Sequence, residues 1–430
     1  MNKAKLMAVA IVAILAASCA AVYLMNGGGG GGAYRSSDDT GRLMVYGNAN
    51  NDDYLDGEDL EMLERIISGD ADETPYADAN RDGNVDRDDV ALVERMIKRE
   101  EMTIKYDYYR GGRLMPGDVK YPITASCVIG TDAILAIKSI GGVGAITCVS
   151  VGSFDRTMYS DIIGLPSVGE NGSSVSMEEM SKYDVSAMIL MDTPASSAYE
   201  YPGAEAAGID IVRISARNAV ESIAGVITLG YLFQCEERAN RYAEFCDGVL
   251  GAMAQKVGPG RISDSDRVTA LCVTMVNSVS GTSSDYYAAS QIAGAINIAD
   301  WASSTKTFAR GDEWLLEAKY RSDYIIHNRS IGYDSFTDAD LAKTWGTYSV
   351  YFEAMDAYKD GRYIILNANM PVPVRIAYMA SIFYPEIFGA DYGDKMHQRF
   401  IDSFMDNLSA SGYDVTEDGT FLIKRDMIKA

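Results

Sequence analysis

The chain has 430 residues, enough for two or three domains, and its 47% hydrophobic and 23% charged residues are typical of a globular protein. Its net charge of −23 disfavours nucleic acid and anionic membrane surfaces as partners. Two histidines and six scattered cysteines without a CxxC pair leave little material for a histidine metal centre, a Ser-His triad or a zinc site.

The N-terminal segment, 1–26, begins with Lys3 and Lys5 and continues with an uncharged apolar run over 6–25. This pattern predicts a signal peptide or a membrane anchor, and its length suits an uncleaved span. The lysines would stay inside and the rest would be exported, anchored on the extracytoplasmic face. The AASC sequence ending at Cys19 loosely resembles a lipoprotein cleavage box, so lipidation is an alternative. Six glycines at 27–32 begin a flexible linker that extends to residue 41.

Residues 42–102 contain one motif twice, thirty residues apart, within a stretch (38–100) of 19 acidic and 7 basic residues. Side-chain oxygens recur at positions 1, 3, 5, 9 and 12 of a calcium loop, and position 7 would supply a backbone carbonyl. The expected ligands are Asn48, Asn50, Asp52, Tyr54, Asp56 and Asp59 in the first loop, and Asp78, Asn80, Asp82, Asn84, Asp86 and Asp89 in the second. A merely solvated acidic stretch would not repeat this register, so the pattern predicts two bound Ca²⁺ ions. Gly83 suits the turn at position 6, whereas Asp53 stands there in the first loop, which predicts a weaker site.

Each loop is followed by a single predicted helix, because 69–77, with Pro75, is too short and broken to supply a second EF-hand helix. This loop-plus-helix repeat resembles a dockerin, the all-α, calcium-dependent partner module of cohesin domains. The resemblance implies partner contacts at Gly57, Glu58, Arg65, Arg87, Asp88 and Arg95. The usual Ser/Thr pair is absent, so a calcium-stiffened spacer or an intramolecular brace are alternatives to a cohesin-binding module.

From Thr103 the pattern becomes an alternation of apolar strands and helices. Strands are predicted at 121–129, 145–151, 185–191, 209–214, 267–276, 324–327 and 362–367, and helices at 131–140, 290–298 and 374–382. Apolar residues every three or four positions predict a longer helix over 218–253, although Gly225 and Gly230 leave two shorter helices as an alternative. Two α/β lobes with largely parallel sheets are therefore expected, at 103–217 and 255–430, joined by a helix at 218–254.

In their order and spacing, these elements resemble the helical-backbone, periplasmic substrate-binding proteins of ABC importers for siderophores, haem and cobalamin, over about 104–407. The stretches that carry the resemblance are LPSVG (165–169), YDVSAMIL (183–190), GIDIV (208–212), WLLEAKYRSDYII (314–326), DGRY (360–363) and AYMASIFYPEIFG (377–389). The resemblance implies two Rossmann-like α/β lobes joined by one long helix, with only small hinge motion. It also implies capture of a metal chelate between the lobes and its delivery to an ABC permease.

Ligands of open α/β sheets bind at the carboxyl ends of the strands, so the candidate contacts are side chains that follow the predicted strands. They are Ser126, Phe154, Asp155, Arg156, Tyr159 and Thr193 in the first lobe, and Asn277, Tyr286, His327, Arg329 and Asn369 in the second. The arginines would pair with carboxylates or catecholates, and the tyrosines would stack on a planar ligand. His327 would either ligate haem or cobalt or be a structural histidine. The resemblance further implies permease docking through Glu200 or Glu205 and through Glu353.

Two other functions are consistent with the sequence. The first is a calcium-dependent cell-surface protein that binds a cohesin-type partner and whose lobes have no transported ligand. The second is an enzyme on the same fold, but the sequence has no nucleophile–base pair, phosphate-binding glycine loop or cysteine cluster. We therefore expect a binding protein and not an enzyme.

Overall fold

The computed structural model of the protein describes residues 42–110, 113–192, 199–215, 219–304, 306–307 and 321–429. The expected anchor and linker at 1–41 lie outside these residues. In the described part of the chain, no helix is both long enough and apolar enough to cross a membrane. The described residues form two compact units, one within Arg35–Cys246 and one within Asp247–Ala430, here called the N-terminal and C-terminal units.

The N-terminal unit begins with the two acidic loops, and one helix follows each of them, as the sequence predicts. These helices are α2 (Gly57–Ser68) and α3 (Arg87–Ile97). Each begins with a capping box in which loop position 9 is the N-cap and the aspartate at position 12 bonds back to the N-cap amide. Leu63 of α2 and Val93 and Met96 of α3 are buried. The position-12 aspartates therefore start the helices as well as ending the loops.

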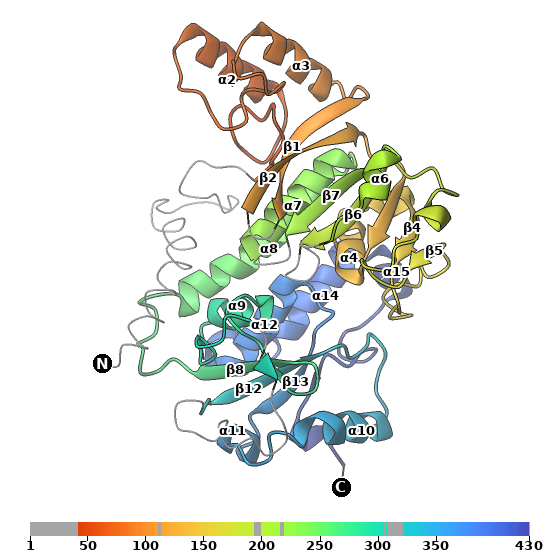
Figure 1. Ribbon diagram of the computed structural model, residues 1–430. Helices are drawn as coiled ribbons and strands as arrows, with labels where there is room; N and C mark the ends of the chain where they lie inside the picture. The colour runs from red at the N-terminus through yellow and green to blue at the C-terminus, as the bar shows by residue number, and fades with distance from the viewer. Residues whose placement is uncertain are drawn as a thin grey trace. The chain divides into compact units, whose positions relative to one another are not determined.

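An antiparallel hairpin follows, formed by β1 (Met102–Arg110) and β2 (Arg113–Tyr121). The predicted single strand at 121–129 is wrong, because residue 121 ends β2 and a separate strand, β3, begins at Ser126. The hairpin packs against β7, the edge strand of the N-terminal sheet (Figure 1). The Tyr106 hydroxyl donates to the Ile211 carbonyl oxygen at 3.3 Å, and the Lys120 amide donates to the Asp210 carboxylate at 2.7 Å. The hairpin thus covers a sheet edge that would otherwise be open.

The N-terminal sheet has five parallel strands in the order β5-β4-β3-β6-β7. They are β3 (Ser126–Ile129), β4 (Ile146–Ser150), β5 (Ser167–Gly169), β6 (Ala187–Asp192) and β7 (Asp210–Ser215). The accompanying helices are α4 (Thr131–Ser139), η1 (Gly142–Ala145), α5 (Met177–Met180) and α6 (Pro202–Ala206). The central strands β3 and β6 are almost wholly buried, as expected for strands covered on both faces.

The long helix predicted over 218–253 is wrong: the chain forms α7 (Ala219–Leu232) and α8 (Glu236–Val257). Between them Gln234 takes a left-handed conformation, with φ of 55°. The Gln234 amide donates to the Tyr231 carbonyl at 3.0 Å and the Cys235 amide to the Gly230 carbonyl at 2.7 Å, which is a Schellman helix end. Gly230 also admits a close neighbour, since a Cβ there would lie 2.3 Å from the Ala239 Cβ. Only α8 passes from the N-terminal unit into the C-terminal unit.

The C-terminal unit contains a seven-stranded mixed sheet in the order β11-β9-β8-β12-β13-β14, with β10 paired to β8. The strands are β8 (Thr269–Thr274), β9 (Ser278–Val279), β10 (Ile296–Asn297), β11 (Lys306–Thr307), β12 (Tyr324–Arg329), β13 (Tyr363–Asn367) and β14 (Leu422–Ile423). The helices are α9 (Asp285–Ile292), α10 (Asp338–Ser349), α11 (Asp356–Lys359), α12 (Val372–Phe383), α13 (Pro385–Phe388), α14 (Tyr392–Phe404), α15 (Asp406–Ser411) and η5 (Arg425–Met427). The pairs of β8 with β10, β8 with β12 and β12 with β13 are parallel.

The helix predicted at 290–298 lies earlier, as α9, because Gly294 takes φ of 95° and the chain then enters β10. The other strands predicted after 140 agree with the structure to within two residues at each end. Buried side chains of α10, including Trp345, join Leu271, Ile325 and Ile365 of the sheet in one apolar core.

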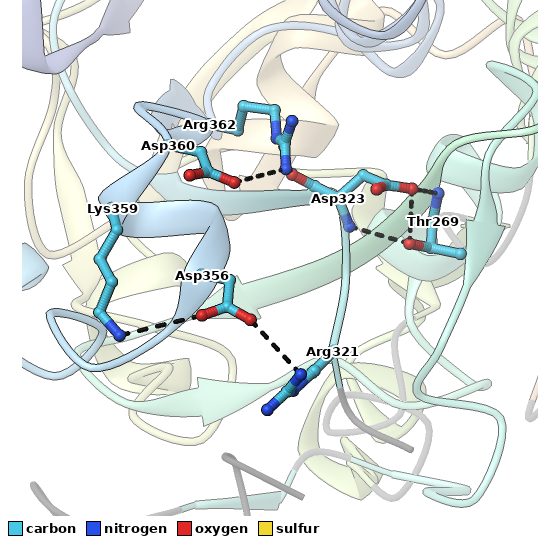
Figure 2. A network of polar contacts seen from close by, with 7 residues as sticks. All are labelled: Thr269, Arg321, Asp323, Asp356, Lys359, Asp360 and Arg362. Atoms are coloured by element: carbon cyan, nitrogen blue, oxygen red, sulfur yellow. Dashed lines mark hydrogen bonds and ion pairs between the residues drawn. The ribbon is translucent and has the colours of Figure 1, made fainter. Parts of the chain in front are cut away.

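A polar network joins the amino ends of three neighbouring strands, β8, β12 and β13 (Figure 2). The Asp323 carboxylate accepts hydrogen bonds from the amide and the hydroxyl of Thr269, both at 2.8 Å. Nε of Arg362 donates to the Asp323 carbonyl oxygen at 2.8 Å, and the Arg362 guanidinium pairs with Asp360 at 2.9 Å. Asp323 and Arg362 belong to the stretches that carry the family resemblance. Their contacts fix the register of strands, so their role here is structural.

The tight approach at Gly230 gives a first prediction. Gly230→Ala should lower the free energy of unfolding by about 1–3 kcal/mol, because the new methyl group must displace Ala239. Gly248→Ala is the matched control, since Gly248 is exposed in α8 and a Cβ there meets nothing within 4 Å. It should be stabilising by about 0.5–1 kcal/mol through helix propensity. Urea unfolding of both variants checks this, and equal effects would contradict the packing described.

Candidate functional site

Four of the predicted ligand contacts lie together at the carboxyl edge of the N-terminal sheet. Phe154, Asp155, Arg156 and Tyr159 occupy the loop that follows β4. The Tyr159 hydroxyl donates to the carbonyl oxygen of Thr131, the first residue after β3 and its glycine, at 3.2 Å. Its ring lies 5.6 Å from the ring of Phe154. Tyr159 therefore fixes this loop against the end of the neighbouring strand.

Arg156 is the exposed member of this loop. The Asp155 carboxylate accepts the amides of Thr157 at 3.1 Å and Met158 at 2.9 Å, which holds the turn in which Arg156 lies. The Arg156 side chain makes no hydrogen bond or ion pair with any residue that the structure describes. The edge thus presents an exposed guanidinium on a loop that its neighbours hold in place.

Two of the predicted contacts in the N-terminal unit do not belong to this group. Ser126 lies at the amino end of β3, buried, and its hydroxyl donates to the Ala145 carbonyl at 2.8 Å. Its prediction as a ligand contact is wrong, because β3 begins at this residue, which therefore lies at the opposite, amino edge of the sheet. Thr193 lies outside the described residues.

Arg329 is placed at the carboxyl edge of the C-terminal sheet, as the last residue of β12. Its Nη2 donates to the Tyr348 hydroxyl at 2.9 Å, and its guanidinium lies 4.5 Å from the centre of the Tyr348 ring. Asn367, the last residue of β13, is opposite Arg329 in the parallel register, so the two side chains share one face. The Asn367 amide oxygen accepts the backbone amide of Asn369 at 2.9 Å.

Two buried donors at this edge have no partner among the described residues: Nε of Arg329 and Nδ2 of Asn367. Burying a polar group without a partner costs free energy, so such atoms are normally satisfied by water or a ligand. Both are donors, and one is cationic, so this part of the edge suits ligand oxygens that carry negative charge. Asn367 ends the strand predicted at 362–367, and the residues from Asn367 to Asn369 are candidate contacts by the same position rule.

His327 is a structural histidine, and its prediction as a ligand contact is wrong. It is fully buried, with Nδ1 at 2.7 Å from the Tyr363 hydroxyl and Nε2 at 2.5 Å from the Met275 carbonyl oxygen. Both ring nitrogens are therefore engaged, and neither is free to bind a metal. Burial lowers the pKa of His327 to about 4. His397 is likewise buried, and its pKa is lowered to about 3.

Asn277 lies at the same edge of the C-terminal sheet, because it follows the carboxyl end of β8, which pairs in parallel with β12, and Tyr286 lies on α9. Asn277 is half-buried in the turn between β8 and β9. Tyr286 lies in the first turn of α9, where the Arg375 guanidinium covers its ring at 4.6 Å. Arg375 also pairs with Asp285 at 2.7 Å. One face of the Tyr286 ring is thus already used within the protein.

The three candidate docking glutamates are all exposed but differ in their contacts. Glu200 forms an ion pair with Arg110 at the end of β1. Glu205, on α6, makes no side-chain hydrogen bond or ion pair with a described residue. Glu353 follows α10 in the C-terminal unit. Glu205 is therefore better placed than Glu200 to meet a partner.

The two acidic loops share one pattern of hydrogen bonds. The Asp59 carboxylate accepts the amides of Asn50 at 3.2 Å and Asp56 at 2.8 Å, and Asp89 accepts their counterparts in the second loop at 3.1 and 2.8 Å. The position-5 amide donates to the position-1 side chain at 3.1 Å in both loops. No group of three or more His, Cys, Asp or Glu side chains in the described residues is gathered as a metal cluster.

The loops differ at position 6. Gly83 takes φ of 95°, whereas the backbone at Asp53 is not left-handed. The Asp53 carboxylate instead accepts the backbone amide of Arg42 at 2.8 Å and pairs with its guanidinium at 2.6 Å. Asp53 therefore has a contact of its own, which the loop pattern alone does not indicate.

The sequence matches no protein-family model and no curated protein. Among solved structures, the chain is similar to the TroA-like periplasmic binding protein FepB from Veillonella parvula, with a TM-score of 0.58 and 15% identity over 74% of this chain and 99% of that one. It is also similar to CeuE from Helicobacter pylori with Ni(II) bound, with a TM-score of 0.54 and 13% identity over 70% of this chain and 96% of that one. The molybdate-binding protein MolA from Haemophilus influenzae gives a TM-score of 0.53 and 16% identity, over 68% and 95% of the two chains.

The chain has the periplasmic binding fold. This confirms the predicted fold class at the level of a mixed α/β protein of two lobes. At these identities the likeness concerns the fold, and the ligand must be argued from the residues of this chain.

The buried histidines give a second prediction. Because their pKa values are lowered to about 4 and about 3 while an unfolded histidine titrates near pH 6.5, their neutral forms stabilise the fold fully above pH 6.5. This stabilisation is lost as the pH falls from 6.5 towards 4, by roughly 3 kcal/mol for His327. The chain has only two histidines, so ¹⁵N-histidine NMR can follow each ring. Neither should protonate between pH 7 and 5; a His327 signal that titrates near 6.5 would contradict the burial described.

Proposed function

We propose that the protein is an exported substrate-binding protein that captures an anionic metal chelate and delivers it to an ABC import permease. The proposal rests on one observation above all: two buried donors at the carboxyl edge of the C-terminal sheet, on Arg329 and Asn367, have no hydrogen-bond partner among the described residues. Parallel α/β sheets bind ligands at that edge. The periplasmic binding fold and the apolar segment at 6–25 support capture outside the cytoplasm.

The side chains at the carboxyl edges of the two sheets favour an anionic ligand. Arg156 and Arg329 are cations that would bind carboxylate, catecholate or hydroxamate oxygens through paired N–H groups. The Tyr348 ring holds the Arg329 guanidinium in one plane, so little side-chain entropy is lost on binding. Among the solved structures above, one holds Ni(II) and one holds molybdate, which are a metal ion and a metal oxyanion.

Within the ligand class predicted from sequence, an iron–siderophore complex is favoured over haem or a cobalamin-type ligand. His327 was the candidate axial ligand for haem or cobalt, and both of its ring nitrogens are engaged. Glu205 and Glu353 are the proposed contacts with the permease. We expect no catalysis, since the proposed roles are binding and presentation only.

The third prediction concerns ligand binding. Calorimetric titration of the full chain with ferric catecholate and hydroxamate siderophores, haem and cobalamin should find binding of a ferric siderophore. Arg329→Gln and Arg156→Gln should each raise Kd about tenfold or more, as expected for lost hydrogen bonds to a charged group. The matched control is Arg321→Gln. Arg321 is exposed at the amino edge of the sheet that contains Arg329, and it pairs loosely with Asp356 at 3.7 Å. An equal loss in the control, or no binding by any chelate, would contradict the proposal.

We further propose that each acidic loop holds one Ca²⁺ ion. Residues 48–59 and 78–89 supply the oxygen-rich ligand set that calcium prefers, and the two loops are bonded alike. The Asp59 and Asp89 carboxylates are fully buried at the helix starts. Burial raises the pKa of Asp59 to about 7 and raises that of Asp89 as well, so a neighbouring positive charge would favour the ionised form of each carboxyl group. A divalent cation would supply that charge and hold the loop side chains together.

The fourth prediction concerns these loops. Titration with Ca²⁺ should find two ions per chain, and Asp59→Ala or Asp89→Ala should each remove one. Asp88→Ala is the control, because Asp88 is exposed and lies outside the proposed ligand set. Its titration should match that of the unchanged protein. No heat of binding at millimolar Ca²⁺ would overturn the calcium proposal.

A calcium-dependent protein partner is the second candidate function. The dockerin-like contact positions Gly57, Glu58, Arg87 and Asp88 are all exposed in the structure. A cohesin-type protein would bind this face in calcium and be released by a chelator. Capture of such a protein by a chain that binds no chelate would favour this function over transport.

A further inference from the structure

The segment 42–48, here called the connector, makes hydrogen bonds on one side to the first acidic loop and on the other to the lobe that carries the N-terminal sheet. We propose that Ca²⁺ in the first loop fixes this connector and thereby braces the hairpin and α7 of the same chain. The inference rests on the calcium proposal above, and it assigns the module a partner within its own chain.

The loop side of the connector involves two residues of the first loop in particular. The Asp53 carboxylate accepts the Arg42 amide at 2.8 Å and pairs with the Arg42 guanidinium at 2.6 Å. The buried Asn48 side chain donates from Nδ2 to the carbonyl oxygens of Leu43 and Asp52, both at 2.8 Å. Asn48 and Asp52 are both proposed calcium ligands. An ion bound by these two residues would therefore also hold the connector in place.

The lobe side of the connector is bonded to β1 and to α7. The Tyr46 amide donates to the Lys105 carbonyl and the Asp107 amide to the Met44 carbonyl, both at 2.9 Å, so the connector lies alongside β1. The Met44 amide donates to the Thr228 hydroxyl of α7 at 3.2 Å. Figure 1 shows the hairpin lying between the two loop-following helices and β7.

Apolar packing reinforces these bonds. Met44 and Tyr76 of the module form a buried cluster with Ala224 of α7, and Tyr46 and Tyr109 pack against it. At α8, Arg99 forms an ion pair with Glu236 at 3.0 Å. The module is therefore packed on the lobe.

The second loop lacks the corresponding contacts. Its position 6 is Gly83, which has no side chain to pair with an arginine, and its position 1 is Asp78, which cannot donate as Asn48 does. Its side-chain contacts to the connector and hairpin come through Arg81, 3.9 Å from Asp118 and 4.9 Å from the centre of the Tyr46 ring. The first loop thus holds the connector through its residues at positions 1 and 6, and both of these differ from their counterparts in the second loop.

Without an ion, the carboxylates of the first loop repel one another, and the loop that positions Asn48 and Asp53 loosens. The connector would then lose its fixed end. Its hydrogen bonds to β1 and to Thr228 of α7 would be lost with it. Because the hairpin covers the edge strand β7, calcium in this loop would also protect the edge of the ligand-binding sheet. The second loop should have a smaller effect on the lobe.

The test is amide hydrogen exchange of the full chain in Ca²⁺ and in chelator, with calcium titration of each sample. In the unchanged protein, Ca²⁺ should slow exchange in the hairpin and α7 about tenfold or more. Asp53→Asn and, separately, Thr228→Val should abolish most of this slowing while two ions still bind, since neither residue is a proposed ligand. Asp88→Ala is the control on the second loop and should leave the slowing intact, since Asp88 is exposed and lies outside the proposed ligand set.

The outcomes separate the two proposals. If two ions bind but Ca²⁺ does not slow exchange in the hairpin and α7, the brace is wrong and the calcium proposal stands. The same conclusion follows if Ca²⁺ slows exchange in Asp53→Asn and Thr228→Val as much as in the unchanged protein. If no ion binds, both are wrong. The bound-ion count also shows whether each variant retains a folded module.

Discussion

The N-terminal unit depends on how the open edge of β7 is covered. A parallel sheet buried on both faces still exposes the hydrogen-bonding groups of its edge strands, and an uncovered edge invites pairing with other chains. Here the hairpin covers that edge through Tyr106 and Lys120, and the connector in turn lies along the hairpin. The hairpin is thus held from both sides, by the sheet and by the module that precedes it. This arrangement explains why a small acidic module is part of the same compact unit as the sheet.

Much of the fold follows from sequence because buried parallel strands are short apolar runs. The strands β4, β6, β7, β8, β12 and β13 lie within two residues of their predicted positions. The long helix was wrong because its apolar period continues across the break: Leu232, Phe233 and Ala239 are all buried. The break itself is a left-handed Gln234, and glutamine gives no signal for that conformation. The hairpin was missed because only alternate residues such as Ile104 and Val119 are buried, among many charged ones.

The candidate site was less predictable, because burial and pairing depend on tertiary contacts. Arg156 and Arg329 follow from their positions after strands, but their difference does not. Arg156 is exposed and makes no side-chain bond to a described residue, whereas Arg329 is stacked on Tyr348. His327 was a plausible ligand in sequence and is engaged at both nitrogens in the fold. The stretches that carry the family resemblance include Asp323, Arg362 and Tyr384, whose contacts join structural elements. Such residues predict a fold well and a ligand poorly.

The first acidic loop shows how a departure from a repeat can be interpreted in two ways. Considered alone, Asp53 at a glycine position and Asn48 at an aspartate position indicate a weakened calcium site. In the fold, Asp53 pairs with Arg42, and the amide nitrogen of Asn48 donates two bonds that a carboxylate could not make. The loss of one carboxylate from the proposed ligand set is therefore accompanied by a gain in contacts to the connector. On this argument the first loop is adapted to hold the lobe, while the second, which keeps Gly83 and Asp78, retains the stronger ligand set.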